Sequence, residues 1–186
     1  MEKVSYRRLT ESDCERMREI DASQYIGRAW REVDGARHLV MSDYHDPDWP
    51  NGYAHHHSSL KRTIMEDGAA FGAFACHDGG DSLVGIASLD RMTGEGKADE
   101  VLLDQLFISR EYRNRGIGKE LFNLCLAAAK EWGLERIRIY AGSAEETIAF
   151  YFAIGCREAA VIDREAEGYD PRDFQLEFLV PEKLNQ

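Results

Sequence analysis

The sequence has no apolar run of about 18 residues or more, which is what a membrane-spanning helix requires. It has only four cysteines, which lie far apart and form no Cys-x-x-Cys pair. This spacing argues against a zinc site or a disulfide framework and favours reduced, packed thiols. The N-terminal stretch lacks the apolar core of a secretory signal, so we expect a cytoplasmic protein.

Positive charge is also scarce. The chain has 23 Lys and Arg against 34 Asp and Glu, which gives a formal net charge of −11. This balance argues against nucleic-acid binding and is compatible with a cationic small substrate. A length of 186 residues with 44% hydrophobic residues is ordinary for one globular domain, so we expect residues 1–186 to form a single domain.

Hydrophobic periodicity and turn residues predict a mixed α/β chain. Strands are predicted over residues 4–9, 69–76, 83–89, 101–109, 136–140, 156–162 and 174–180. Helices are predicted over residues 11–20, 53–66 and 118–132, and a capping box over residues 143–146 that begins at Ser143 predicts a further helix through Ile154. Asp34-Gly35 predicts a hairpin of open register, and residues 43–52, with two prolines, predict a loop.

A basic, glycine-bearing turn lies between the apolar strand at 101–108 and the amphipathic helix that follows. It reads Arg113-Asn114-Arg115-Gly116-Ile117-Gly118, and residues 110–119 carry a net charge of +3 on an acidic protein. Glycines allow a sharp turn and a close approach of the backbone to a ligand. Free N–H groups and the helix dipole favour an anion at such a helix start. The turn therefore predicts an anion-binding site.

These residues resemble the GNAT superfamily of N-acetyltransferases. The acetyl-CoA signature of that family is Gln/Arg-x-x-Gly-x-Gly/Ala, and residues 113–118 match it in full. Residues 102–108 look like the family's fourth strand, and Tyr151 with Gly155 looks like its late helix. The resemblance covers residues 69–180, the expected acetyl-CoA-binding core. It implies a largely antiparallel central sheet of about seven strands, splayed between strands 4 and 5, with helices on both faces.

The resemblance implies acetyl-CoA as co-substrate, with its pyrophosphate on backbone N–H groups of the turn. These would come from Asn114, Arg115, Gly116, Ile117, Gly118 and Lys119, with added charge from Arg113 and Arg115. The pantetheine arm would lie along the backbone of Leu106, Phe107 and Ile108. An N–H near Leu106 would stabilise the thioester oxygen as it gains charge. The alternatives are a solvated basic turn and an ordinary core strand.

The resemblance also implies catalytic roles. Tyr151 stands where the family has the tyrosine that protonates the leaving thiolate, and a packed tyrosine is the alternative. Asp104 stands where several members place a base that takes the amine's proton. Glu100, Asp90 or a water relay could do the same work, and Asp104 could instead make a structural hydrogen bond.

One position departs from the family pattern. Many members have Asn at the start of the late helix, contacting pantetheine, and this chain has Ala144. The neighbouring Ser143 could cap the helix, contact the cofactor, or do both. Residues 20–66 match no part of the pattern, and we expect them to form a variable acceptor-side segment that caps one side of the sheet.

In that segment, aromatic and carboxylate side chains are combined in a way that suits an alkylammonium, although a surface loop with a folded-in tryptophan has the same composition. These residues are Tyr44, Asp46, Asp48, Trp49 and Tyr53. The nearby run His55-His56-His57 points in different directions on a helix, so we expect no metal.

The sequence thus predicts an N-acetyltransferase that moves an acetyl group to a primary amine by direct attack. No Gly-x-Ser-x-Gly motif is present, which disfavours a covalent intermediate. A non-catalytic acyl-CoA-binding sensor of the same fold is the alternative, whereas a dinucleotide-binding or Walker-type site lacks its motif. The expected partner is a small-molecule or peptide amine, with no nucleic acid and no membrane, and a homodimer is compatible with the sequence.

Overall fold

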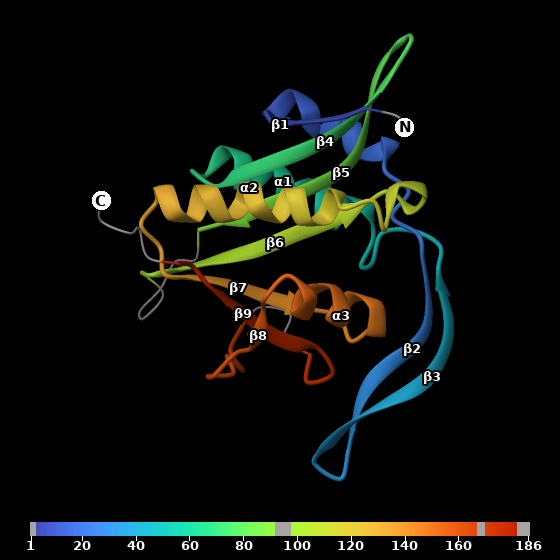
Figure 1. Ribbon diagram of the computed structural model, residues 1–186, viewed down its shortest axis with the longest axis vertical. Coiled ribbons are helices and arrows are strands. Elements are labelled where there is room, and N and C mark those ends of the chain that lie inside the picture. Colours follow the sequence, from blue (N-terminus) through green and yellow to red (C-terminus); the bar gives the residue numbers. More distant parts are fainter. Residues whose placement is uncertain (1–2, 92–97, 167–169, 182–186) are drawn as a thin grey trace.

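The protein is described by a computed structural model that covers residues 3–91, 98–166 and 170–181. A seven-stranded sheet has the order β1-β4-β5-β6-β7-β9-β8, and a separate hairpin pairs β2 with β3 (Figure 1). The strands are β1 (Val4–Arg8), β2 (Gln24–Val33), β3 (Ala36–Asp46), β4 (Ala69–His77), β5 (Gly80–Asp90), β6 (Glu100–Ile108), β7 (Arg136–Ala141), β8 (Arg157–Glu158) and β9 (Phe174–Leu179). The helices are η1 (Glu11–Glu19), α1 (Tyr53–Met65), η2 (Arg110–Tyr112), α2 (Ile117–Glu131) and α3 (Glu145–Ala153).

The sheet confirms the predicted fold class. Its neighbours pair antiparallel except β6 and β7, which are parallel. These two strands pair only as far as Leu103 and Ile139, while β6 continues to Ile108. The sheet therefore opens between its fourth and fifth strands, counted along the sheet, as the predicted splay requires.

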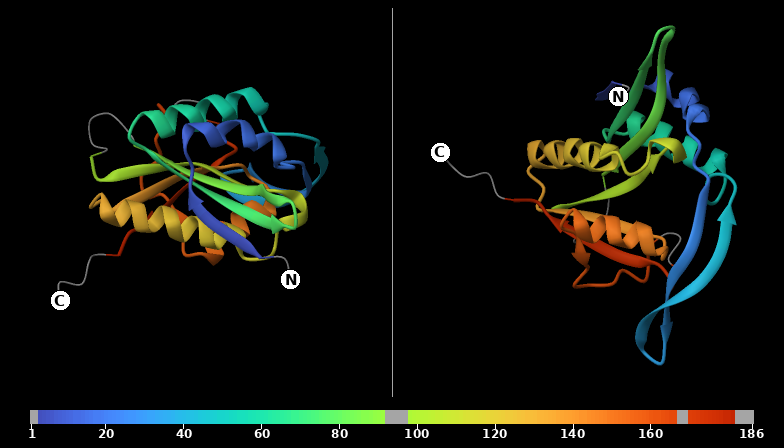
Figure 2. Two further views of the ribbon diagram at one scale, coloured as in Figure 1. Left: turned by 90° about the horizontal axis from the view of Figure 1, so that it is seen from above. Right: turned by 45° about the vertical axis from the view of Figure 1, so that its right-hand side comes forward.

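Helices cover both faces of the sheet (Figure 2). On one face, α2 presents Leu121, Phe122 and Cys125 to a core that includes β6 and β7. On the other face, η1 and α1 contribute Met17 and Leu60 to a second core with β4 and β5. The predicted helices over 53–66 and 118–132 are confirmed within one or two residues at each end.

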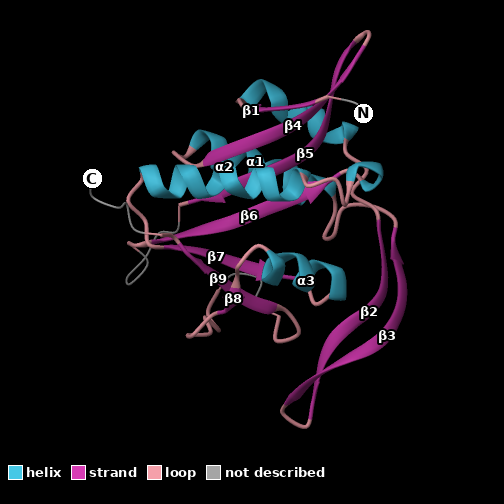
Figure 3. Ribbon diagram, viewed as in Figure 1, coloured by secondary structure: helices cyan, strands magenta, loops and turns pink. Residues whose placement is uncertain are grey.

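The β2–β3 hairpin extends away from the sheet as a long two-stranded ribbon (Figure 3). Val33 pairs with Ala36, and the two residues between them, Asp34 and Gly35, have φ of 51° and 77°. Positive φ at both positions characterises the tight turn that matches the twist of a hairpin. The hairpin is confirmed, but β3 runs to Asp46, so the predicted loop at 43–52 begins too early.

Two further predictions need correction. The strand predicted at 156–162 is limited to Arg157 and Glu158, because the chain then turns back and the Val161 carbonyl accepts a hydrogen bond from Arg138. The segment predicted as a helix over 11–20 is a 3₁₀ helix rather than an α-helix.

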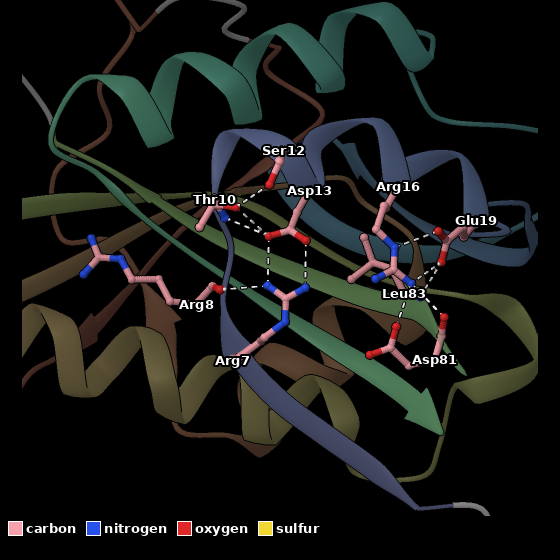
Figure 4. Close-up of polar contacts among 9 residues, drawn as sticks. All are labelled: Arg7, Arg8, Thr10, Ser12, Asp13, Arg16, Glu19, Asp81 and Leu83. Carbon is pink, nitrogen blue, oxygen red and sulfur yellow. Dashed lines mark hydrogen bonds and ion pairs between the residues drawn. The ribbon is translucent and has the colours of Figure 1, made fainter. Parts of the chain in front are cut away.

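Side-chain contacts fasten η1 to the sheet (Figure 4). Arg7 of β1 donates to both carboxylate oxygens of Asp13, at 2.8 and 2.7 Å. Glu19 accepts from the backbone N–H of Leu83 in β5 at 2.6 Å and pairs with Arg16. The 3₁₀ segment is therefore held at both of its ends.

Candidate active site

The basic turn has the backbone geometry of an open helix start. Gly116 has φ of 82° and immediately precedes α2. The first helical bond runs from the Glu120 N–H to the Gly116 carbonyl at 3.1 Å, so three N–H groups, those of residues 117–119, precede it. A Cβ placed on Gly116 would meet no atom within 4 Å. The turn therefore leaves room on its outer side for an anion.

Gly118 serves a different purpose, because it permits close packing. A Cβ at this position would lie 3.3 Å from the ring of Phe150, which belongs to α3. The start of α2 thus contacts the helix that carries Tyr151, and the two elements meet beside the turn.

The basic side chains of the turn are in two kinds of environment. Arg113 is half-buried and donates from Nε to the carbonyl oxygen of Ile108 at 2.9 Å. Burial lowers the pKa of Arg113, and the carboxylates of Asp21 and Glu146 oppose this effect. Arg115 is exposed, with its guanidinium carbon 4.9 Å from the centre of the Tyr112 ring. Arg113 therefore also holds the turn against the end of β6.

In the described part of the chain, the backbone of β6 next to the turn pairs with a strand on one side only. Leu106, Phe107 and Ile108 pair with β5 through Ala87, Ile86 and Gly85. On the other side, pairing with β7 has already ended at Leu103. The edge of residues 106–108 therefore borders the opening in the sheet, where the pantetheine arm was expected.

Asp104 is the extra residue of a β-bulge at the start of this opening. Leu103 pairs with Leu89 and Gln105 pairs with Ser88, so Asp104 has no partner of its own in β5. A bulge changes the direction of the side chain. The Ser59 hydroxyl of α1 donates to Asp104 Oδ2 at 2.6 Å. In the described part of the chain, Oδ1 of Asp104 has no hydrogen-bond partner.

The other two candidate bases differ from Asp104. Glu100 is buried, and its oxygens accept from Arg138 at 2.8 and 3.1 Å and from Arg136 at 3.1 Å, so both are engaged in an ion-pair network. Asp90 pairs with Arg62 at 3.2 Å. Burial raises the pKa of Asp90, Arg62 opposes this effect, and the Asp104 carboxylate adds to the rise.

Tyr151 lies on α3 and is buried. Burial, with smaller contributions from the Cys156 and Cys125 thiols, raises the pKa of the Tyr151 phenol above its ordinary value. The hydroxyl has no hydrogen-bond partner among the residues that the structure describes. Such a phenol stays protonated at neutral pH and has a proton to donate.

The capping box predicted at Ser143 is wrong. Ala144 is the N-cap residue of α3; it is buried and forms an isolated bridge with Ala29 of β2. The Ser143 hydroxyl instead accepts a hydrogen bond from Arg31 at 2.6 Å. The Ser143 hydroxyl, which the sequence predicted as the cap of this helix, therefore binds Arg31 of the β2 strand instead.

The predicted acceptor residues do not form one exposed group. Trp49 is buried, with its ring centre 4.8 Å from that of Phe107 and 5.4 Å from that of His56. Tyr53 is half-buried beside Trp49, whereas Tyr44 is exposed on the hairpin. Asp46 ends β3, and Asp48 accepts a hydrogen bond from the backbone N–H of Trp49.

The three consecutive histidines point in different directions, as expected. His55 is exposed, His57 lies 3.1 Å from Glu15, and His56 is buried with Nε2 2.6 Å from the Pro50 carbonyl oxygen. Burial lowers the pKa of His56.

Sequence reasoning missed Ser59 and Arg62, which lie on α1 next to the site. Ser59 is buried although it is polar, and Arg62 contacts both Ser59 and Asp90. A usable signal was present, because Ser59 and Thr63 are four residues apart on the face that also carries Leu60.

Comparisons with known proteins agree with this fold. Residues 38–155 match the model of the acetyltransferase (GNAT) family. Among curated proteins, no sequence matches this chain. Within the described residues, no helix is long and apolar enough to cross a membrane.

Several solved acetyltransferases are similar in structure. One is nourseothricin acetyltransferase, with a TM-score of 0.71 and 18% identity, covering 96% of this chain and 99% of that one. Another is a putative streptothricin acetyltransferase from Bacillus anthracis in complex with acetyl coenzyme A, with a TM-score of 0.67, 16% identity, and coverage of 96% and 98%. A third is the Escherichia coli ribosomal-protein-S18-alanine N-acetyltransferase, with a TM-score of 0.60, 12% identity, and coverage of 99% of each chain. Since the family match spans more than half of its length, this chain belongs to the acetyltransferase (GNAT) family.

Proposed function

We propose that this protein transfers the acetyl group of acetyl-CoA to a primary amine by direct attack within a ternary complex. The observation that carries the proposal is the opening between β6 and β7. Asp104 lies where it begins, the free edge of residues 106–108 borders it, and the basic turn follows the end of β6. The proposed base, the strand edge proposed for pantetheine and the proposed anion site therefore follow one another along β6 and the turn after it.

The turn suits the pyrophosphate of acetyl-CoA. Residues 117–119 provide N–H groups at the helix start, where the dipole favours negative charge. The open space outside Gly116 admits phosphate oxygens, and Arg115 and Lys119 add exposed positive charge. The edge of residues 106–108 in β6 is not paired with β7, which suits a pantetheine arm that binds as an additional strand.

The chemistry assigns one proton to each of two groups. Asp104 Oδ1 takes a proton from the acceptor's ammonium, and the amine nitrogen then forms a bond to the thioester carbon. The carbon–sulfur bond breaks, and the departing thiolate takes the proton of the Tyr151 hydroxyl. The former amine nitrogen then loses its second proton to the Tyr151 phenolate, which leaves the neutral amide and the neutral phenol, and Asp104 releases its proton to solvent. A backbone N–H near Leu106 stabilises the carbonyl oxygen while it carries negative charge. Positioned acids and bases of this kind contribute on the order of 10²–10⁴-fold each.

An amine acceptor fits the local charge. Asp104 and Asp90 lie close enough to influence one another, and Arg62 is the cation that pairs with Asp90 among the described residues. The similar structures include enzymes named for nourseothricin and for a ribosomal-protein alanine, which supports a small-molecule or peptide amine as acceptor.

Calorimetric titration with acetyl-CoA, followed by thiol release with a panel of amines, tests this function. We expect micromolar binding and amine-dependent release of CoA. Binding without turnover on any amine would instead favour a non-catalytic acyl-CoA sensor. Absence of binding by both acetyl-CoA and CoA would contradict the assignment of the turn.

A further inference from the structure

A chain of hydrogen bonds connects α1 to the candidate base. Arg62 Nη2 lies 3.2 Å from Asp90 Oδ2 and 3.4 Å from Ser59 Oγ, and Ser59 Oγ lies 2.6 Å from Asp104 Oδ2. We propose that Ser59 and Arg62 are positioning residues for acetyl transfer, which hold the Asp104 carboxylate by one oxygen so that the other accepts the amine's proton. This inference rests on the proposed function and assigns roles to two residues outside the family signature.

The direction of these hydrogen bonds is fixed by chemistry. A guanidinium can only donate, so Ser59 accepts from Arg62 and has its single proton left for Asp104. The distance of 2.6 Å between Ser59 Oγ and Asp104 Oδ2 is typical of a hydroxyl that donates to an ionised carboxylate. Arg62 therefore orients Ser59, and Ser59 orients Asp104 in its charged form.

Asp104 needs such an anchor because the bulge leaves it without a partner in β5. Gln105 Nε2 approaches the same oxygen, Oδ2, at 3.4 Å, and it donates at 2.9 Å to the carbonyl of His56. Both contacts thus fall on Oδ2. A carboxylate held by one oxygen presents the other in a fixed direction, which is what proton transfer requires.

The charged groups around Asp104 come from three elements, α1, β5 and β7. On α1 these are Arg62 and His56, and burial lowers the pKa of His56, which favours its neutral form. On β5 the charged group is Asp90, which pairs with Arg62. From β7, Arg138 faces Glu100 and is neutralised by it. Arg62 is thus the cation that limits repulsion between Asp90 and Asp104.

The test compares Ser59→Ala with Ser58→Ala, which changes an exposed serine next to it on the same helix. We expect Ser59→Ala to lower kcat/KM for the amine about tenfold or more, while acetyl-CoA affinity stays within about twofold. The acidic limb of the pH profile should move to higher pH, because a hydrogen bond to the charged form is lost. Ser58→Ala should match the wild type, and Ser59→Thr, which keeps the hydroxyl, should recover most of the rate.

Arg62→Gln provides a second variant whose folding is not at risk, since half of the Arg62 side chain is exposed. It should lower the rate several-fold and move the acidic limb in the same direction. In an Asp104→Asn background, Ser59→Ala should have no further effect.

A rate loss in Ser59→Ala without a shift of the pH profile, and without rescue by threonine, would show a structural role and overturn the inference. The same holds if Ser59→Ala and Arg62→Gln are both as active as the wild type. An active wild-type enzyme with such variants leaves the proposed function standing. A wild-type protein that binds acetyl-CoA but acetylates no amine would overturn both the proposed function and the inference about Ser59 and Arg62.

Discussion

Arg113 donates from Nε to the carbonyl oxygen of Ile108 at 2.9 Å, so the basic turn is fastened to the last residue of β6. Arg113→Gln should therefore lower the free energy of unfolding by about 1–3 kcal/mol, because a charged hydrogen bond in a half-buried place is lost. It should also weaken acetyl-CoA binding, because the turn is no longer held in place. Urea unfolding and calorimetry measure the two effects.

Arg115→Gln is the matched control for this substitution. Arg115 is exposed and rests on the ring of Tyr112, a contact that contributes about 0.5–1 kcal/mol at a surface. This variant should lose affinity that depends on salt while its stability stays close to that of the wild type. Equal stability of both variants would show that the bond to Ile108 does not hold the turn.

Gly116→Asp should abolish acetyl-CoA binding, because the new carboxylate would occupy the open space outside the turn and repel the phosphates. Gly133→Asp is the control, since Gly133 follows the other end of α2. The two glycines have φ of 82° and 72°, and a Cβ on either meets no atom within 4 Å. Both variants should lose about 1–2 kcal/mol of stability from the left-handed backbone.

Calorimetry with CoA separates the two glycine variants. Only Gly116→Asp should lose binding, and Gly133→Asp should bind as the wild type does. Retained binding in a folded Gly116→Asp variant would place the phosphates elsewhere.

Tyr151→Phe should lower kcat by about 10²-fold or more while acetyl-CoA affinity changes little. Because the hydroxyl has no hydrogen-bond partner in the described part of the chain, its removal should change the unfolding free energy by less than about 1 kcal/mol. Tyr6→Phe, on β1 at the edge of the sheet, controls for loss of a tyrosine hydroxyl. Unchanged turnover in Tyr151→Phe would remove Tyr151 from the acid role.

The parts of the site that the sequence predicts are those set by local backbone chemistry. Gly116 has a positive φ, which selects glycine directly, and Gly118 lies close to Phe150, which favours a small residue there. The hairpin turn at Asp34-Gly35 follows from the same reasoning. Such features depend on a few neighbouring residues, so a short sequence motif is enough to predict them.

The remaining parts depend on contacts between distant residues. The orientation of Asp104 arises from its register against β5 and from Ser59, which lies 45 positions away. Ser143 fits a capping box in sequence, but Arg31 of the hairpin engages its hydroxyl. Trp49 sits in a loop rich in turn residues, yet it is buried against Phe107. Tertiary packing outweighed local propensity at each of these positions.

Asp13→Asn should make stability less sensitive to acid. The Asp13 carboxylate accepts two hydrogen bonds from Arg7 and one each from the N–H and hydroxyl of Thr10 (Figure 4). The Arg7 guanidinium holds the pKa of Asp13 well below its ordinary value, against the opposing effect of burial. A carboxylate with a depressed pKa stabilises the fold fully above its unfolded pKa, near 3.9, and this stabilisation is lost as pH falls toward the folded pKa.

We therefore expect Asp13→Asn to cost about 1–3 kcal/mol at pH 7 and pH 5, and the difference from the wild type to shrink below about pH 4. Urea unfolding at pH 7, 5 and 3 measures it. Asp81→Asn is the control, because Asp81 pairs with Arg16 at the exposed surface and such pairs contribute less than about 1 kcal/mol. A difference between Asp13→Asn and the wild type that stays constant down to pH 3 would mean that the asparagine loses packing or hydrogen bonds but no charge interaction with Arg7. The Arg7–Asp13 pair between β1 and η1 would then contribute no charge-dependent part to the free energy of unfolding, despite the short distances between its atoms.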